Sequence, residues 1–436
     1  MLKFSVLIPA FNGEKYIEDC LESVLTQDYP ALEIVCVDDG STDATPRILA
    51  ARAAADRRLR YWSQSNSGIV AARKRAAQNA DGDYFIFLDA DDELLPGALT
   101  AIAAQLHSRP TAMLQFGFKF APSFPGNATP ADFRVYSGVP LSGRAVFREL
   151  VMAHRTGHNI NQRVVSAALA RRVFAAVDDF YAVNLEDLYL STLFSWLADS
   201  FTAFPAACVL HRMDTGVTAA RRLSAVGFSR LVEDTVAVFS RLDAALRRLG
   251  IGADGMSAVL EMRAMRVRVL FEVAATRLSP EDFPAGYAVL ERNLGKRTMA
   301  LLLPFMYYNI PASAAAAVIP AAPAALRDDG GVLMFAGKPL DVSVKNAVFF
   351  EPPRFPGTPD AAARRSLQLF DRLTMLRPRL LVEYEPDPKC LLWDAVTAGL
   401  AGVPVAVIAA SPQRLSSLRR HCGLNASNLN ELLKSL

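Results

Sequence analysis

Cysteine is scarce in this sequence, and the five cysteines lack the spacings that bind zinc or build a disulfide framework. They are dispersed through 436 residues and include no Cys-x-x-Cys pair. The N-terminus also lacks the charged segment, apolar core and cleavage site of a secretory leader, because Met1-Leu2-Lys3 runs directly into the strand-like residues 4–8. Both absences predict a reducing, cytosolic compartment.

Charge of one sign is not in excess. The 47 lysines and arginines nearly balance the 44 aspartates and glutamates, which leaves a formal net charge of +3. A dedicated nucleic-acid binder carries a larger basic excess, so we expect no nucleic-acid partner. Hydrophobic residues make up 52% of the chain, which excludes an intrinsically disordered protein, and the length predicts two or three domains.

Charged residues are missing from one long stretch, residues 299–326. Its length would suffice for a membrane span. Prolines interrupt the stretch, however, and we therefore interpret residues 299–329 as an Ala/Pro-rich linker or a packed irregular segment. Association with a lipid surface remains an alternative, since Lys296, Arg297 and the arginine-studded helical stretch before them would favour anionic lipids.

What the sequence does contain, from residue 4 to about residue 106, is an alternation of short apolar runs with amphipathic stretches. Strands are expected at residues 4–8, 32–37, 60–62 and 84–88, with helices between them. This order predicts an α/β fold, with a largely parallel sheet covered on both faces. Ligands bind such sheets at the carboxyl ends of the strands.

The rest of the chain predicts three further parts. After a strand at 113–120 and helices at 141–152 and 185–197, a long helical stretch covers residues 219 to about 275. Strand–helix alternation then returns after residue 330, which predicts a second, smaller α/β unit. Its expected strands are 332–335, 347–350, 380–384 and 403–409, and its expected helices are 361–376, 391–400 and a helix from residue 411.

Carboxylates follow the second and the fourth strand. The second ends in Val37-Asp38-Asp39-Gly40-Ser41-Thr42-Asp43, where helix capping accounts for Ser41, Thr42 and Asp43 but leaves Asp38 and Asp39 to accept hydrogen bonds from a base or a sugar. The fourth ends in Leu88-Asp89-Ala90-Asp91-Asp92, whose aspartates repel one another unless a cation offsets their charge. Such hard oxygen ligands suit Mg²⁺ or Mn²⁺. A solvated acidic loop is the alternative for the Asp-x-Asp pattern taken alone.

As an ordered set, these motifs and four others resemble the N-terminal domain of a family 2 inverting glycosyltransferase with the GT-A fold. The resemblance covers roughly the first half of the chain. The motifs are Val6-Leu7-Ile8-Pro9-Ala10-Phe11-Asn12, Val37-Asp38-Asp39-Gly40-Ser41-Thr42-Asp43, Asn66-Ser67-Gly68 with Ala72-Arg73, Asp89-Ala90-Asp91-Asp92, Leu185-Glu186-Asp187, and His211-Arg212-Met213-Asp214-Thr215-Gly216-Val217-Thr218.

The resemblance implies a role for each motif. Asp39 would bind the nucleobase, Asp89 would lie near the ribose and base, and Asp91 would hold the Mn²⁺ or Mg²⁺ that bridges the two phosphates of the donor. Asp187 would be the general base, with Glu186 as the less favoured candidate because adjacent helical side chains point about 100° apart. The other residues that the resemblance places at the donor are Pro9, Phe11, Asn12, Asp38, Asn66, Gly68, Arg73, Ala90, His211 and Arg212.

The C-terminal unit is harder to interpret. Residues 380–405 resemble the closing half of a GT-B glycosyltransferase, in which a helix and a glycine turn precede a buried strand. The paired glutamates of that family are not reproduced, because Trp393 stands eight residues after Glu385. We therefore favour a noncatalytic role, such as acceptor binding, dimerisation or scaffolding, over a second nucleotide-sugar site.

Taken together, the sequence predicts a GT-A domain over residues 1–218, a helical segment over 219–298, the linker over 299–329 and a Rossmann-like domain over 330–436. We expect a metal-dependent, inverting transferase that moves a sugar from a nucleoside diphosphate sugar, with UDP-sugar favoured, to a saccharide or lipid-linked acceptor in bacterial capsule or lipopolysaccharide synthesis. A cytoplasmic location fits this activity. Attachment to the inner face of the membrane, homo-oligomerisation, a nucleotide-sugar-binding module without turnover and a nucleotidyltransferase remain alternatives.

Overall fold

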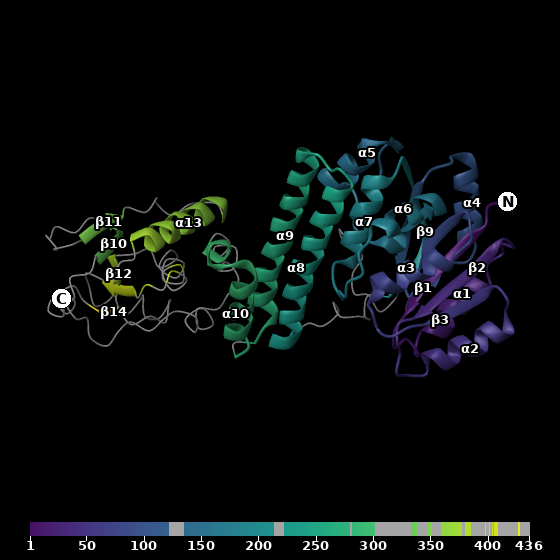
Figure 1. Ribbon diagram of the computed structural model, residues 1–436, viewed down its shortest axis with the longest axis horizontal. Helices are drawn as coiled ribbons and strands as arrows, with labels where there is room; N and C mark the ends of the chain where they lie inside the picture. Colours follow the sequence, from purple (N-terminus) through teal and green to yellow (C-terminus); the bar gives the residue numbers. More distant parts are fainter. Residues whose placement is uncertain are drawn as a thin grey trace. The chain divides into compact units, whose positions relative to one another are not determined.

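The structure is a computed structural model in two compact units (Figure 1). It describes residues 1–121, 135–212, 222–279, 281–300, 333–337, 347–350, 359–376, 380–384, 397, 401, 403, 405–408 and 426–427. The first unit comprises residues 1–220 with 234–263, and the second comprises residues 221–233 with 264–436. Helices α8 (Ala225–Arg248) and α9 (Ala253–Arg277) are each divided between the two units.

A nine-stranded sheet, counted over the described residues, forms the centre of the first unit. Its order is β3-β2-β1-β4-β8-β6-β9-β5, and β7 pairs with β9. The strands are β1 (Phe4–Ala10), β2 (Leu32–Asp38), β3 (Leu59–Ser63), β4 (Tyr84–Phe87), β5 (Glu93–Leu94), β6 (Met113–Phe120), β7 (Leu141–Ser142), β8 (Arg163–Ser166) and β9 (Ser200–His211).

The four strands for which the sequence predicts a parallel sheet are parallel, and the strands that follow them form a mixed part of the sheet. Strand β1 pairs in parallel with β2 and β4, and β2 does so with β3. Strand β8 is antiparallel to both β4 and β6, and β9 is parallel to β6 but antiparallel to β5 and β7. The mixed half follows from β8, which lies between β4 and β6 and reverses the direction of pairing.

Alternating side chains of the central strands supply two hydrophobic cores, one on each face of the sheet. Leu7 and Val35 belong to the core that helices α3, α5, α6, α7 and α8 complete. Val6 and Ile8 belong to the other core, which α1, α2 and α4 complete. Because both faces are covered, β1 and β2 are buried along their whole length, as their continuous apolar sequences predict.

The helices of the first unit mostly begin and end close to the expected positions. They are α1 (Ile17–Leu25), α2 (Thr45–Ala55), α3 (Ile69–Asn79), α4 (Ala98–Ser108), α5 (Arg144–Phe147), α6 (Ala167–Ala176) and α7 (Glu186–Leu197), with a π-helical turn at Arg148–Met152 and a 3₁₀ turn at Ile160–Gln162.

One helix prediction needs correction. The helix expected at 141–152 starts late, because Leu141 pairs with Phe201 of β9 and the Gly143 amide donates to the Asp199 carbonyl at 2.9 Å. The helical stretch expected at 219–275 is present as two helices, α8 and α9, and Gly250 between them has a φ of +74°.

The second unit contains the smaller α/β fold that the sequence predicts. Its described strands form a parallel sheet in the order β11-β10-β12-β13-β14, accompanied by helices α10 (Phe283–Leu294) and α13 (Pro359–Leu376). The strands are β10 (Leu333–Gly337), β11 (Ala347–Phe350), β12 (Leu380–Tyr384), β13 (Val405–Ile408) and β14 (Ala426–Ser427).

Several predictions lie outside the described residues. The linker at 299–329 does so from residue 301 on, as do most of the helix at 391–400 and the helix from residue 411. Among the residues that the structure describes, no helix is both long enough and apolar enough for a membrane span.

Candidate active site

A cavity of about 430 Å³ opens at the carboxyl ends of β1, β2 and β4. This volume lies within the range of small-molecule sites, roughly 300–1,000 Å³. The cavity brings together most of the residues predicted for the donor site, although they are far apart in the sequence. Those that line it are Pro9, Phe11, Asn12, Asp39, Asn66, Gly68, Asp89, Ala90, Asp91 and Glu186.

Phe11 and Asn12 follow β1 and differ in their contacts. Phe11 leaves about half of its surface exposed at the cavity. Asn12 joins the loops after β1 and β2, since its side-chain oxygen accepts from the Thr42 amide at 2.8 Å and its own amide donates to the Ser41 hydroxyl at 2.9 Å. Ser41 and Thr42 therefore fix this loop pair and do not cap α2, whereas Asp43 accepts from the Thr45 amide at the start of that helix.

The two carboxylates at the end of β2 are both buried, but only one of them lines the cavity. Asp38 is buried, accepts from the Ser41 amide at 3.1 Å and does not line the cavity. Asp39 does line it, and its oxygens accept from the backbone amides of Ser67 at 2.9 Å and Gly68 at 2.8 Å. These bonds hold Asp39 at the turn that precedes α3.

The acidic residues after β4 form the one group of three potential metal ligands among the described residues. One oxygen each of Asp89, Asp91 and Asp92 can be chosen so that all lie within 4.8 Å of one another. Three carboxylates at this spacing fit a hard divalent cation, which is the donor set that Mg²⁺ and Mn²⁺ prefer. Only Asp89 and Asp91 of the three also line the cavity.

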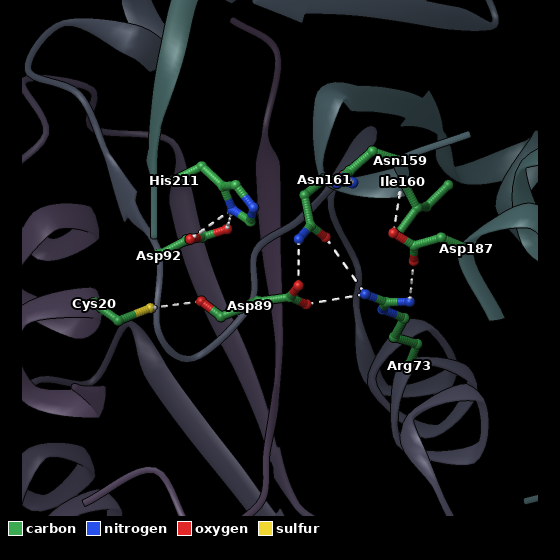
Figure 2. Close-up of polar contacts among 9 residues, drawn as sticks. All are labelled: Cys20, Arg73, Asp89, Asp92, Asn159, Ile160, Asn161, Asp187 and His211. Carbon is green, nitrogen blue, oxygen red and sulfur yellow. Dashed lines mark hydrogen bonds and ion pairs between the residues drawn. The ribbon is translucent and has the colours of Figure 1, made fainter. Parts of the chain in front are cut away.

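Asp92, to which the sequence assigned no separate role, is the fully buried member of this group. Its carboxylate contacts His211 Nδ1 at 2.8 Å (Figure 2). It also accepts from the Arg212 amide at 3.1 Å. Burial raises the pKa of Asp92 to about 6, although His211 opposes the shift. Burial lowers the pKa of His211, but the hydrogen bond and charge of Asp92 outweigh it and hold that pKa above its usual value.

The structure places His211 and Arg212 beside the cavity but not in its lining. His211 is the last residue of β9 and turns toward Asp92. Arg212 donates to Glu93, and its guanidinium carbon lies 5.4 Å from the ring centroid of Tyr16, which does line the cavity. The remainder of the expected phosphate loop, residues 213–218, lies outside the described residues.

Arg73 joins two carboxylates to which the resemblance gives different roles, Asp89 at the donor and Asp187 as the general base. Its side chain is completely buried and donates to Asp89 at 2.9 Å and to Asp187 at 2.8 Å (Figure 2). Burial alone would lower the pKa of Arg73, but these two charges outweigh it and raise that pKa above its usual value. Arg73 is therefore engaged with protein carboxylates in this structure, where the resemblance predicted a contact with the donor.

Asn161 completes this network and was not found from the sequence. It is buried in the 3₁₀ turn, and its amide nitrogen donates to the second oxygen of Asp89. The turn also supplies the Ile160 amide, which lies 3.4 Å from Asp187. No local pattern marks Asn161, because its partner lies 72 residues away.

Glu186 and Asp187 occupy the first turn of α7. Leu185, the residue before the helix, has a φ of +63°, and this turn of the backbone directs Glu186 to the cavity. Burial raises the pKa of Glu186 to about 8, and the charge of Asp187 adds to the shift. Burial also raises the pKa of Asp187, although Arg73 opposes it. The helix N-terminus favours negative charge at both positions.

The comparisons with known proteins agree with this arrangement of motifs. The model of the family described as Glycosyl transferase family 2 matches residues 5–172. Chondroitin synthase of Escherichia coli is 46% identical over 95 residues, which cover 22% of this chain and 14% of that protein. GalNAc(5)-diNAcBac-PP-undecaprenol beta-1,3-glucosyltransferase of Campylobacter jejuni is 36% identical over 104 residues, which cover 23% of this chain and 34% of that protein. The chain thus spans about a third or less of the length of these curated relatives.

Solved structures also align with the chain, at lower identity. The S. aureus TarS 1–349 complex with UDP-GlcNAc is 20% identical, with a TM-score of 0.44 over 68% of this chain and 90% of that chain. A mannosyltransferase from Pyrobaculum calidifontis, in complex with GDP-Man and Mn²⁺, is 19% identical, with a TM-score of 0.42 over 69% of this chain and 79% of that chain. Both TM-scores are below 0.5.

Proposed function

Residues 5–172 belong to glycosyl transferase family 2, and from this premise we propose that the protein is a metal-dependent, inverting glycosyltransferase. It would move a sugar from a nucleoside diphosphate sugar, with a UDP-sugar as the first donor to test, to a saccharide or lipid-linked saccharide in bacterial surface polysaccharide synthesis. The observation that carries this proposal is that Asp39, Asp91 and Glu186, from three separate elements, line one cavity.

The donor half of the cavity is assigned to the residues after β1, β2 and β4. Asp39, held by the amides of Ser67 and Gly68, would accept hydrogen bonds from the nucleobase, and Phe11 offers an aromatic surface beside it. Asp91 would hold the divalent cation together with the phosphates of the donor. When bound, that cation supplies a Lewis acid that offsets the negative charge of the leaving nucleoside diphosphate.

The acceptor half is assigned to the start of α7. Asp187 would take the proton of the acceptor hydroxyl while the hydroxyl oxygen bonds to the anomeric carbon from the face opposite the phosphate. The bond from that carbon to the phosphate oxygen breaks in the same step, so the configuration inverts. Arg73 stabilises the ionised form of Asp187 before the proton moves, because the two groups lie 2.8 Å apart.

Donor binding is tested by thermal unfolding of the purified protein with uridine, guanosine, cytidine or thymidine diphosphate, each with and without Mn²⁺. A ligand that binds only the folded state stabilises it, by about 2.7 kcal/mol at 100 times its dissociation constant. We expect stabilisation by one nucleotide that depends on Mn²⁺ and disappears in Asp91→Asn. Stabilisation by none of the four would contradict the donor site.

Turnover is tested with the same nucleotide as its sugar conjugate. Asp187→Asn should bind the donor normally and lose transfer by a factor of about 100 to 10,000, the usual contribution of a general base. Glu186→Gln should retain more activity than Asp187→Asn. A greater loss of transfer in Glu186→Gln than in Asp187→Asn would assign the role of base to Glu186. Donor binding without product in the wild type would favour the binding-module alternative, and pyrophosphate release from a nucleoside triphosphate would favour the nucleotidyltransferase.

A further inference from the structure

Helix α8 runs beside the segment that connects α6 to α7, residues 177–185. Asp234, Arg241 and Arg248 of α8 are spaced by seven residues, which is close to two helical turns, and so they share one face of the helix. This face contacts the connecting segment at three successive places. All of these residues belong to the first compact unit.

The two arginines contact the first part of the segment. Arg248 donates to the Asp178 carboxylate at 2.9 Å and to the Ala176 carbonyl at 3.3 Å. The guanidinium carbon of Arg241 lies 6.0 Å from the ring centroid of Phe180. Both arginines are largely exposed to solvent, and exposed ionic contacts of this kind contribute little to stability.

Asp234 makes the strongest of the three contacts. One oxygen of its buried carboxylate accepts from the Val183 amide at 3.0 Å, from the Asn184 amide at 3.1 Å and from the Asn184 side chain at 3.2 Å. Hydrogen bonds to an ionised acceptor are stronger than those between neutral groups. Without this oxygen, two backbone donors next to α7 would lose their partner.

The segment held in this way forms one wall of the cavity and leads directly into the catalytic helix. Tyr181, Ala182 and Val183 line the cavity, and Leu185 makes the left-handed turn from which Glu186 and Asp187 start. The donor residues Asp39 and Asp91 lie in other loops, which follow β2 and β4. A shift of residues 183–184 would therefore move the general base relative to the donor.

We propose that Asp234 is a positioning residue of the transferase site, which sets the start of α7 by holding the amides of Val183 and Asn184. This inference depends on the proposed function for the role of Asp187. It extends the site beyond residue 218, where the sequence predicts the end of the GT-A domain, since Asp234 lies in α8. The first part of the helical segment is then part of the enzyme's active-site architecture.

The test uses the full-length protein with Asp234→Ala and Asp234→Asn. The asparagine keeps an oxygen that can accept the same three hydrogen bonds, and the alanine does not. In Asp234→Ala we expect kcat to fall by at least about tenfold, since a displacement of about 1 Å costs on the order of 100-fold. The affinity for the nucleoside diphosphate should stay at the wild-type value, and Asp234→Asn should recover most of kcat.

Two variants of the same helix separate positioning from general destabilisation. Leu246→Ala removes a fully buried side chain about three turns along α8, and Asp243→Ala removes an exposed partner of Arg247. Measured below the unfolding temperature of every variant, both should keep the wild-type kcat. An equal loss of kcat in Leu246→Ala and Asp234→Ala, or a wild-type kcat in Asp234→Ala, would overturn the proposal.

Amide hydrogen exchange gives a readout that does not depend on transfer. Exchange at Val183, Asn184 and the first turn of α7 should accelerate in Asp234→Ala and remain slow in Leu246→Ala. If the wild type transfers no sugar, the proposed function fails, and this measurement still decides the positioning role. Unchanged exchange at Val183 and Asn184 would then overturn it.

Discussion

At the scale of single residues, the charges of this site depend on burial. Arg73 is completely enclosed and has two carboxylate partners that are each about a quarter exposed, so the guanidinium would be unstable as an ion without them. Arg172 forms a pair of similar length with Asp199, 2.9 Å, but both side chains are about half exposed or more. Two ion pairs of similar length are therefore expected to contribute different amounts to the free energy of unfolding.

Replacing Arg73 with methionine should destabilise the protein by about 3 kcal/mol, because two partly buried carboxylates lose their counter-charge and repel one another. Arg172→Met is the matched control and should cost about 0–1 kcal/mol. Urea unfolding at pH 7 measures both. Adding Asp187→Asn to Arg73→Met should recover part of the loss, and equal values for the two arginine variants would contradict this account.

Glu186 predicts a pH dependence of stability. Its pKa is about 8 in the folded protein and near the ordinary glutamate value in the unfolded chain, so between these values the folded state holds more protons. Stability should therefore fall as the pH rises from about 5 to about 8, at a cost of about 1.4 kcal/mol for each pH unit between the two pKa values. In Glu186→Gln, thermal unfolding in the absence of metal should show a smaller fall. An identical pH profile would exclude the raised pKa.

At the scale of elements, the turn between β3 and α3 shows how a helix start can shape the cavity. Gly68 has a φ of +89° and a ψ of 159°, a conformation almost restricted to glycine. Its amide donates to Asp39, and an added Cβ would lie 3.2 Å from Cδ2 of Tyr181. The glycine thus permits both the carboxylate contact and the close approach of Tyr181.

Gly68→Ala should cost about 1–3 kcal/mol of stability through backbone strain and should also weaken nucleotide binding. Gly97→Ala is the matched control, because Gly97 also has a positive φ, +76°, but has nothing within 4 Å of an added Cβ. The free energy of unfolding of Gly97→Ala should fall by about 1–2 kcal/mol, and its nucleotide binding should not change. Thermal unfolding and nucleotide titration separate the two effects, and normal binding by Gly68→Ala would argue against this role of the turn.

At the scale of the whole molecule, the boundary of the first unit falls within helices and not in a linker. Residues 234–263 of α8 and α9 belong with residues 1–220, so a domain ending at residue 218 would lack part of its own core. Val238, Leu242 and Leu246 of α8 lie in the same hydrophobic cluster as Leu7 and Val35. The transferase fold is therefore expected to need these helices.

A fragment of residues 1–277, which ends with α9, should unfold cooperatively and bind nucleotide like the full-length protein. A fragment of residues 1–218 should not, because it lacks Asp234 and the core residues of α8. Circular dichroism during heating and nucleotide titration compare the two. A stable, binding-competent 1–218 fragment would restore the boundary that the sequence predicts.

Much of this protein could be predicted from its sequence, because the relevant signals are local. Apolar runs bounded by turn residues located β1, β2, β6 and α7, and the carboxylates after β2 and β4 had to lie at the ligand-binding edge of the sheet. The order of the motifs also predicted the resemblance to family 2 glycosyltransferases, which the match over residues 5–172 confirms. Which residues face the cavity was largely predictable, since strand ends fix the direction of the loops that follow.

Only the tertiary structure decided which charged groups meet. Arg73 pairs with Asp187, 114 residues away, and with Asp89, 16 residues away, and so it is held inside the protein. Asn161 and Asp234 enter the site from a 3₁₀ turn and from a helix whose sequences carry no active-site pattern. The antiparallel strand β8 was likewise not predicted from the sequence. Hydrophobic periodicity is a property of residues that are neighbours in the sequence. The partner of a buried charge depends instead on which distant segments pack together, because packing excludes water and an unpaired ion is destabilising where water is excluded.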